Sequence, residues 1–340
     1  MNRGDKPDRA SNWKLWAGLI ISALFLVLAF REVDFPRTWA LIRTSDLSFL
    51  GLAAVVTFMQ YVARAWRWRI LLDPLKKTRY LNRLLPILIG FAANCILPAR
   101  LGEFIRANYI GQREDVSASS VFGTIVIERI FDGFTLLFSL LTGLMATAFP
   151  PKLQEMSGTL KATALILFLA YILIIVFIWG FKYKTDSFLR IIKKILFFLS
   201  PSLRSKIIRI IRNFSLGLVP IKGWPGWVLA IFYSFLVWGL ALFQIQWIGY
   251  AIHISVPFIA TFIILPMATF GVMIPSAPGY IGTFHLAAQY GFLFYGVTRE
   301  EALSAAILWH AVFFFPTIFF GMVAFFIFQV QDNRRGQKER

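Results

Sequence analysis

Ionisable side chains lie inside an apolar stretch of the sequence, where they could bind a charged group. Residues 119–141 are mostly apolar but contain Glu128, Arg129 and Asp132. Glu128 and Asp132 are four residues apart and share one face of a helix, and Arg129 can pair with either carboxylate. A charge at the centre of a bilayer costs at least about 2.5–3.5 kcal/mol and normally faces a partner or water. The pattern predicts either a polar patch lining a groove or an ion pair that holds helices together.

A second charged group follows a proline. Arg100, Glu103 and Arg106 come directly after Pro98, and Glu103 and Arg106 are neighbours on a helix. The planar guanidinium group binds phosphate through paired N–H donors. These residues predict a phosphate headgroup site at the cytoplasmic mouth of the protein, and the alternative is ordinary positive charge on a solvated turn.

Arginine and tryptophan alternate over residues 64–69. We expect Arg67 and Arg69 to anchor a helix at the membrane interface, where basic and aromatic residues gather. Arg64 is the deepest of these arginines along the chain, and it is the one that we predict to face the groove.

Two histidines lie in the second half of the chain. His285 and His310 could titrate, or could pair across an internal repeat, and the alternative is a buried, hydrogen-bonded histidine without a further role. The sequence has no Cys-x-x-Cys pair and no His-x-x-x-His pair, so we expect no metal. It also lacks a Gly-x-x-x-x-Gly-Lys-Ser/Thr loop, so we expect no nucleotide-driven motor and no cofactor.

The composition of the chain indicates which kind of structural element positions these residues. Of 340 residues, 58% are hydrophobic and 15% charged, and 35 Lys and Arg face 17 Asp and Glu. A soluble fold could not cover so much apolar surface. The sequence therefore excludes a soluble enzyme, a disulfide scaffold and a disordered chain, and it predicts an all-α polytopic membrane protein. We expect the excess of positive charge to face an anionic membrane surface rather than nucleic acid.

Six segments are long and apolar enough to span a bilayer. They are residues 15–30, 47–63, 119–141, 162–181, 227–250 and 302–331. Two further apolar stretches, 84–99 and 256–294, are interrupted by prolines and glycines, which break helices, and they belong to the segments 84–115 and 256–298. We predict that both are re-entrant helical hairpins, and the alternative is two kinked ordinary spans. The breaking residues are Pro98, Gly102, Pro275, Pro278, Gly279 and Gly282.

The distribution of basic residues predicts the topology. Five segments contain 28 of the 35 basic residues, and the positive-inside rule places them in the cytoplasm together with both termini. The hairpins then enter from opposite sides, as in an inverted-repeat transporter. We predict a first membrane half over residues 1–181, an amphipathic cytoplasmic linker over 182–222, and a second membrane half over 223–340.

These motifs together resemble the flippase-like membrane domain of the lysylphosphatidylglycerol synthase family, a large group of prokaryotic integral membrane proteins. The resemblance covers nearly the whole chain and rests on residues 67–72, 97–106, 128–132 and 275–282. Many relatives have Glu at the position of His285 and Arg at that of His310, so this chain departs from the pattern there. The resemblance implies lipid translocation in a prokaryotic cytoplasmic membrane, without the aminoacyl-transfer domain of the full-length synthases.

We therefore expect a flippase rather than an enzyme. It would move a phosphate-bearing amino-, glyco- or polyprenyl lipid through a polar groove between the hairpins, with membrane lipids as its partners. One alternative is a membrane transferase acting on a lipid-linked sugar, for which Glu103 is the candidate acid or base. The other is an accessory subunit of a separate lipid synthase or glycosyltransferase.

Overall fold

The computed structural model describes residues 9–97, 100–147, 154–218, 221 and 223–338. All regular secondary structure in these ranges is helical, as predicted. Pro98, one of the predicted helix-breaking residues, lies outside the described residues.

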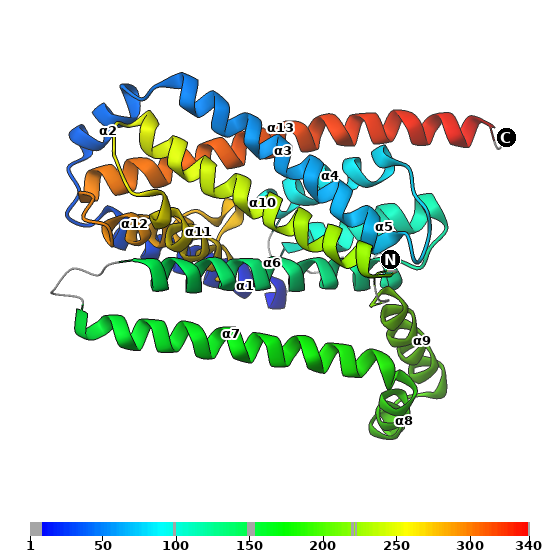
Figure 1. The fold of residues 1–340 in the computed structure, drawn as a ribbon. Helices are drawn as coiled ribbons and strands as arrows, with labels where there is room; N and C mark the ends of the chain where they lie inside the picture. Colours follow the sequence, from blue (N-terminus) through cyan, green and yellow to red (C-terminus); the bar gives the residue numbers. More distant parts are fainter. Residues whose placement is uncertain (1–8, 98–99, 148–153, 219–220, 222, 339–340) are drawn as a thin grey trace.

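Long helices run side by side along one axis of the molecule (Figure 1). They are α3 (Leu47–Leu72), α6 (Ala118–Ala146), α7 (Gln154–Tyr183), α10 (Gly223–Ala251) and α13 (Arg299–Lys338). Segments of α3, α7, α10 and α13 are long and apolar enough to cross a membrane, whereas α6 has the length but carries three charged side chains. Together with α1 (Arg9–Phe30), these helices contain the six predicted spans.

The two interrupted stretches form hairpins of short helices. In the first, α4 (Tyr80–Ile96) packs against α5 (Gly102–Glu114), and in the second, α11 (Phe258–Met273) packs against α12 (Thr283–Leu293). The hairpins occupy opposite ends of the bundle (Figure 1). The longest of these helices has 17 residues and measures about 25 Å, less than the roughly 30 Å hydrocarbon core. The structure thus has two opposed hairpins rather than two kinked spans.

Glycine allows the helices of the first hairpin to approach closely. A Cβ atom on Gly102 would lie 1.9 Å from the carbonyl oxygen of Gly90. The amide of Gly102 also donates a 2.8 Å hydrogen bond to Oδ1 of Asn94. In the second hairpin, a Cβ on Gly271 would lie 2.7 Å from the carbonyl oxygen of Thr283. In both hairpins, therefore, a glycine allows the backbones of the two helices to come into direct contact.

The tips of the two hairpins lie against each other. Pro275 lies in the break after α11, and Pro278 begins the short 3₁₀ helix η4 (Pro278–Tyr280), which packs against α4. The hydroxyl of Tyr280 faces Arg100 of the first hairpin. Both residues are left-handed, with φ of 58° and 54°, and so are Gly279 and Gly282, with φ of 79° and 94°. The left-handed backbone conformation is strained for residues other than glycine. Arg100 and Tyr280 therefore mark backbone strain at the tips of both hairpins.

Each half of the chain packs its hairpin against a long helix of the other half. Helix α4 of the first half packs against α13 of the second, and α11 of the second packs against α6 of the first, while α3 and α10 lie along one another. Each hairpin also contacts the long helix that follows it. This reciprocal arrangement is that of an inverted repeat.

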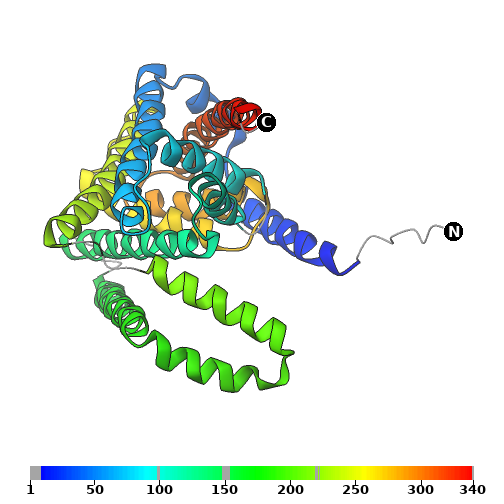
Figure 2. The ribbon, with the colours of Figure 1, turned by 90° about the vertical axis from the view of Figure 1, so that its right-hand side faces the viewer.

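The remaining helices cover this core. Helix α1 packs against α12, and Ser22 of α1 accepts a 2.8 Å hydrogen bond from the amide of Ala277. Helix α2 (Phe35–Arg43) packs against α13, and α7 packs against α6. Helices α8 (Thr185–Ile195) and α9 (Pro201–Gly217), joined by η3 (Leu196–Phe198), extend away from the bundle (Figure 2).

Candidate functional site

Helices α3, α5 and α6 bring charged side chains together around Glu128, which is fully buried. Its carboxylate accepts bonds of 2.5 Å from Nη2 of Arg106 and 2.5 Å from Nη2 of Arg129. Nη2 of Arg67 lies 3.4 Å away, and Nη1 of Arg64 lies 4.0 Å away. One carboxylate on α6 therefore lies within reach of four guanidinium groups from three helices.

Asp132, one helical turn further along α6, extends the same network. It accepts a 2.7 Å bond from Nη1 of Arg67 and 3.2 Å contacts from Arg64 and Arg129. Nε1 of Trp238, on α10, donates a 2.9 Å hydrogen bond to the same carboxylate. The network is buried, with Asp132 4% and Arg67 0% exposed. We call Arg64, Arg67, Arg106, Glu128, Arg129 and Asp132 the charge cluster.

Positive charge exceeds negative charge in the charge cluster. Its four arginines outnumber its two carboxylates by two, and the nearest further carboxylate, Glu103, lies 3.9 Å from Nε of Arg129. Several guanidinium nitrogens of the charge cluster are buried without a hydrogen-bond partner. They are Nε of Arg67, Arg106 and Arg129, and Nη2 of Arg67, which makes only the 3.4 Å ion-pair contact with Glu128. Buried polar groups are normally paired, so this arrangement has unused capacity to bind an anion.

Aromatic side chains surround the charge cluster. The guanidinium of Arg106 stacks 3.7 Å from the ring centroid of Trp68, whose Nε1 donates a 2.9 Å hydrogen bond to Thr124 of α6. The ring of Phe91, on α4, faces both Arg64 and Arg129. Such contacts stabilise desolvated guanidinium groups.

Arg129 and Glu103 lie at the edge of the charge cluster. Their side chains are 30% and 21% exposed, whereas the side chains of Glu128 and Arg67 are not exposed at all. The predicted pairing of Arg129 with Glu128 or Asp132 is present with both partners. The edge at Arg129 and Glu103 is therefore the most accessible part of the charge cluster.

The structure differs from the sequence-based expectation at one residue of α3. Arg67, which the sequence predicts at the membrane interface, is fully buried in the protein, and so is its neighbour Trp68. Arg67 is three residues after Arg64 and faces the same partners on α6. Arg69 does lie at the surface, where it contacts Asp73 at 3.4 Å. Neither Trp238 nor Ser234, which also bond to this network, carries a signal in the sequence that separates it from its apolar neighbours.

The arginines predicted to form a headgroup site lie in different places. Arg100 is at the tip of the first hairpin beside Tyr280, whereas Arg106 lies inside the charge cluster, 2% exposed. Glu103 is between them in sequence and contacts Arg129. The first hairpin thus carries guanidinium groups from its tip to the middle of α5.

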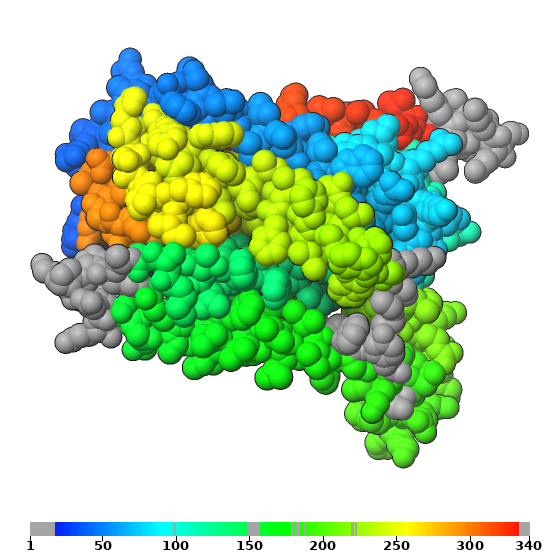
Figure 3. Space-filling view, viewed as in Figure 1, coloured from blue at the N-terminus to red at the C-terminus, as the bar shows by residue number. Residues whose placement is uncertain are grey.

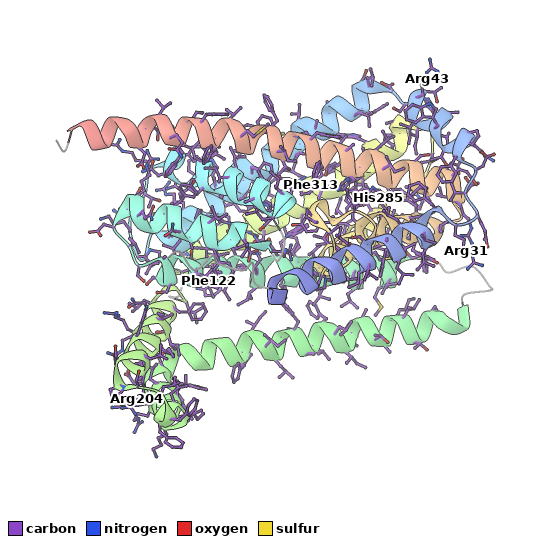
Figure 4. All side chains as sticks on the ribbon, turned by 180° about the vertical axis from the view of Figure 1, so that it is seen from behind. Arg31, Arg43, Phe122, Arg204, His285 and Phe313 are labelled. Atoms are coloured by element: carbon purple, nitrogen blue, oxygen red, sulfur yellow. The ribbon has the colours of Figure 1, made fainter. Side chains whose placement is uncertain are left out.

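The two histidines lie together in the second half, where Figure 4 labels His285. The rings of His285 and His310 are 4.8 Å apart between centroids. Nε2 of His310 lies 2.7 Å from the carbonyl oxygen of Gly279, and Nδ1 of His285 accepts a 3.4 Å bond from the amide of Gly282. Both side chains therefore support the backbone at the tip of the second hairpin. Among the described residues, no three or more His, Cys, Asp and Glu side chains gather as metal ligands would.

Comparison with known proteins decides the family. The family described as the lysylphosphatidylglycerol synthase TM region matches residues 15–321. The chain belongs to this family. The matched range includes the chain's charge cluster, both of its hairpins, and helices α8 and α9.

Several archaeal proteins are similar to the chain. A UPF0104 membrane protein of Pyrococcus horikoshii is 24% identical over 319 residues, covering 90% of this chain and 95% of the relative. Another of Methanothermobacter thermautotrophicus is 22% identical over 316 residues, covering 89% and 91%. Glycosyltransferase AglD of Haloferax volcanii is 30% identical over 137 residues, which is 38% of this chain. The match spans only 22% of the length of that glycosyltransferase.

Proposed function

We propose that this membrane protein moves a phosphate-bearing lipid between leaflets, with the charge cluster receiving the headgroup. The observation that carries the proposal is the buried excess of arginine over carboxylate, together with guanidinium nitrogens that have no hydrogen-bond partner. An isolated charge in hydrocarbon costs tens of kcal/mol, so a phosphate crosses only where fixed donors replace its hydration. Arginine N–H groups are suited to this exchange because they bind phosphate in pairs.

The opposed hairpins supply the second part of the proposal. Their tips meet at Arg100 and Tyr280, so polar groups reach this point from both hairpins. A headgroup would enter at the exposed edge near Arg129 and Glu103, exchange carboxylate contacts for phosphate contacts at Arg106 and Arg67, and leave past the tip of the second hairpin. Separation of the two tips would open this route, in the manner of a transporter whose site lies between repeats.

An apolar cavity gives the lipid tails a place beside this route. It has a volume of about 480 Å³ and lies between α3 and α13. The cavity is lined by Ala54, Val55, Phe58, Phe315, Phe319 and Phe320, together with Pro316. Phe58 is six residues before Arg64 on α3, so acyl chains in the cavity would lie less than two helical turns from the charge cluster.

We also propose the setting in which this occurs. The protein would lie in a prokaryotic cytoplasmic membrane with both termini in the cytoplasm, because the basic loops and the α8–α9 segment are then on the cytoplasmic side. We propose a translocator that performs no chemistry on the lipid. The two carboxylates of the charge cluster are occupied by arginines, and Glu103, the candidate acid or base, lies 3.9 Å from Nε of Arg129.

One relative favours a second candidate. Glycosyltransferase AglD shares 30% identity with 137 residues of this chain. This similarity is consistent with a membrane unit that presents or translocates a lipid-linked sugar for a separate glycosyltransferase. Copurification of such an enzyme, with no leaflet activity from the chain alone, would favour this candidate.

A leaflet assay in reconstituted vesicles tests the main proposal. Fluorescent phosphatidylglycerol is placed in both leaflets, and a membrane-impermeant reductant quenches only the accessible fraction. The wild-type protein is expected to make the inner-leaflet probe accessible, Arg67→Gln is expected to abolish this, and Arg69→Gln is expected to keep it. Arg67 and Arg69 are matched because they lie two residues apart on α3, one fully buried and one at the surface.

Folding of the variants is checked by size-exclusion chromatography and tryptophan fluorescence. If Arg67→Gln fails to fold, Arg129→Gln replaces it, because Arg129 is partly exposed. Equal transport by the wild type and by a folded charge-cluster variant would overturn the proposed route. The absence of leaflet activity in folded wild-type protein, with several phosphate-bearing lipids, would overturn the proposed function.

A further inference from the structure

Helices α8 and α9 form a lobe that projects from the bundle at the end where α4 and α5 lie (Figures 1 and 3). The chain leaves α7, turns at η3 and returns through α9 to α10 (Figure 2). A polar linker alone would be enough to connect two membrane halves. This lobe also contains exposed apolar residues and a cavity lined by cations.

A basic cavity of about 730 Å³ lies between the two helices. Its lining includes the apolar Leu189, Pro201 and Ile208, together with Ser205. The rest of the lining is five cations and one carboxylate: Arg190, Lys193, Arg204, Arg209, Arg212 and Asp186. Nη2 of Arg212 contacts Oδ1 of Asp186 at 3.4 Å, which ties the two helices together. Arg204 is labelled in Figure 4, among the nitrogen-bearing side chains of the lobe. Positive charge therefore converges on a concave site large enough for a lipid headgroup.

Several apolar residues of the two helices point away from this cavity, whereas Leu189 and Ile208 line it. On α8, Ile191 and Ile195 are exposed and lie roughly 180° around the helix from the cavity-lining face. On α9, the exposed Leu203 and Ile210 are placed in the same way. Phe197 and Phe198, in the turn between the helices, are exposed as well.

The lobe thus has exposed apolar side chains on one side and exposed cations along the groove between its helices, whereas a soluble helical hairpin would turn few large apolar side chains to water. This arrangement suits a lobe lying at a leaflet, where acyl chains cover the exposed apolar side chains and an anionic headgroup binds in the basic groove.

The lobe is also joined tightly to the bundle near the charge cluster. A Cβ on Gly217 of α9 would lie 1.9 Å from the carbonyl oxygen of Ser120 on α6, so the helices are in close contact. Oγ of Ser120 donates a 2.8 Å hydrogen bond to the carbonyl oxygen of Asn213. Glu128 lies two turns further along α6. A ligand that fixes α9 would therefore also fix the end of α6 that supports the charge cluster.

We propose that the basic cavity between α8 and α9 binds the phosphate of an anionic glycerophospholipid from the adjoining leaflet, as a site separate from the charge cluster. The five cations would hold the phosphate, and the apolar exteriors of the helices would lie among the acyl chains of the surrounding lipids. The lipid in this site is a bound component that stabilises the lobe against α6. The proposal does not depend on lipid translocation.

Two pairs of matched substitutions test this site in the full-length protein. Lys193→Gln with Arg204→Gln removes two cavity cations, one from each helix. Lys194→Gln with Lys206→Gln removes two exposed cations that do not line the cavity, again one from each helix. The proteins are placed in phosphatidylcholine nanodiscs containing a series of phosphatidylglycerol fractions, and native mass spectrometry counts the phosphatidylglycerol molecules that stay bound.

We expect the cavity pair to weaken retention by about fivefold per cation, and the control pair to leave it at the wild-type level. Asp186→Asn removes the one carboxylate from the cavity and is expected to strengthen retention. Equal retention by the wild type and the cavity pair, or equal losses in the two pairs, would overturn the proposal, since equal losses indicate general attraction to an anionic surface. Displacement of the lipid by millimolar inorganic phosphate would assign the cavity to a soluble anion instead.

Discussion

Replacement of Glu128 by glutamine is the perturbation for which the structure gives the clearest magnitude. The substitution keeps the size of the side chain but removes the charge that lies 2.5 Å from two guanidinium groups, 3.4 Å from a third and 4.0 Å from a fourth. The excess of positive charge in the charge cluster rises from two to three. Removing one partner of a buried ion pair costs about 3–5 kcal/mol, because the remaining charge is left in a medium that does not solvate it.

The assay is unfolding of the purified protein in mixed micelles with increasing sodium dodecyl sulfate, followed by tryptophan fluorescence. Glu128→Gln is expected to lower the free energy of unfolding by about 3–5 kcal/mol. Asp73→Asn is the control, because its partner Arg69 is exposed and surface pairs contribute only about 0.2–1 kcal/mol. Adding Arg106→Met to Glu128→Gln returns the excess charge to two and is expected to restore part of the loss. A cost for Glu128→Gln no larger than that of Asp73→Asn would refute the reasoning.

Two further predictions concern the hairpins. Gly102→Ala places a methyl group 1.9 Å from the carbonyl oxygen of Gly90 and is expected to cost about 3 kcal/mol or more in the same assay. Gly51→Ala is the control, because a Cβ added at Gly51 of α3 would have no neighbouring atom within 4 Å. It is expected to be neutral or to stabilise the protein by about 0.5–1 kcal/mol. Equal effects of the two substitutions would contradict the close approach of α4 and α5. His310→Phe leaves the buried carbonyl of Gly279 without its 2.7 Å partner, so it is expected to lower the free energy of unfolding by about 1–3 kcal/mol. An unchanged free energy of unfolding would show that this contact does not support the hairpin tip.

The sequence was sufficient to predict the helical architecture because the relevant signals are local. Runs of apolar residues mark the long helices, and the Pro and Gly residues at 98–102 and 275–282 mark the two breaks. Helix α3 nevertheless extends to Leu72, past the predicted end at residue 63. Arg64 and Arg67, which follow residue 63, are paired with α6, and paired charges can remain inside the membrane.

The composition of the charge cluster could be predicted only in part. The spacing of Glu128, Arg129 and Asp132 indicates one helix face, but which arginines of α3 face it depends on how α3 is rotated against α6. That rotation follows from the packing of whole helices, so Arg67 and Arg69 could not be separated from the sequence alone. The stacking of Trp68 on Arg106 and the bond from Trp238 to Asp132 also join segments that are distant in the chain.

Whether the two hairpins open to opposite compartments can be measured by cysteine accessibility. In a Cys95→Ser background, single cysteines are introduced at Gln112, near the end of α5, and at Thr298, after α12, both of which are exposed positions. A membrane-impermeant maleimide is applied to intact cells and to permeabilised cells. We expect one of the two cysteines to react in intact cells and the other only after permeabilisation. Reaction of both in intact cells, or of both only after permeabilisation, would contradict a pair of half-crossing hairpins that enter from opposite faces.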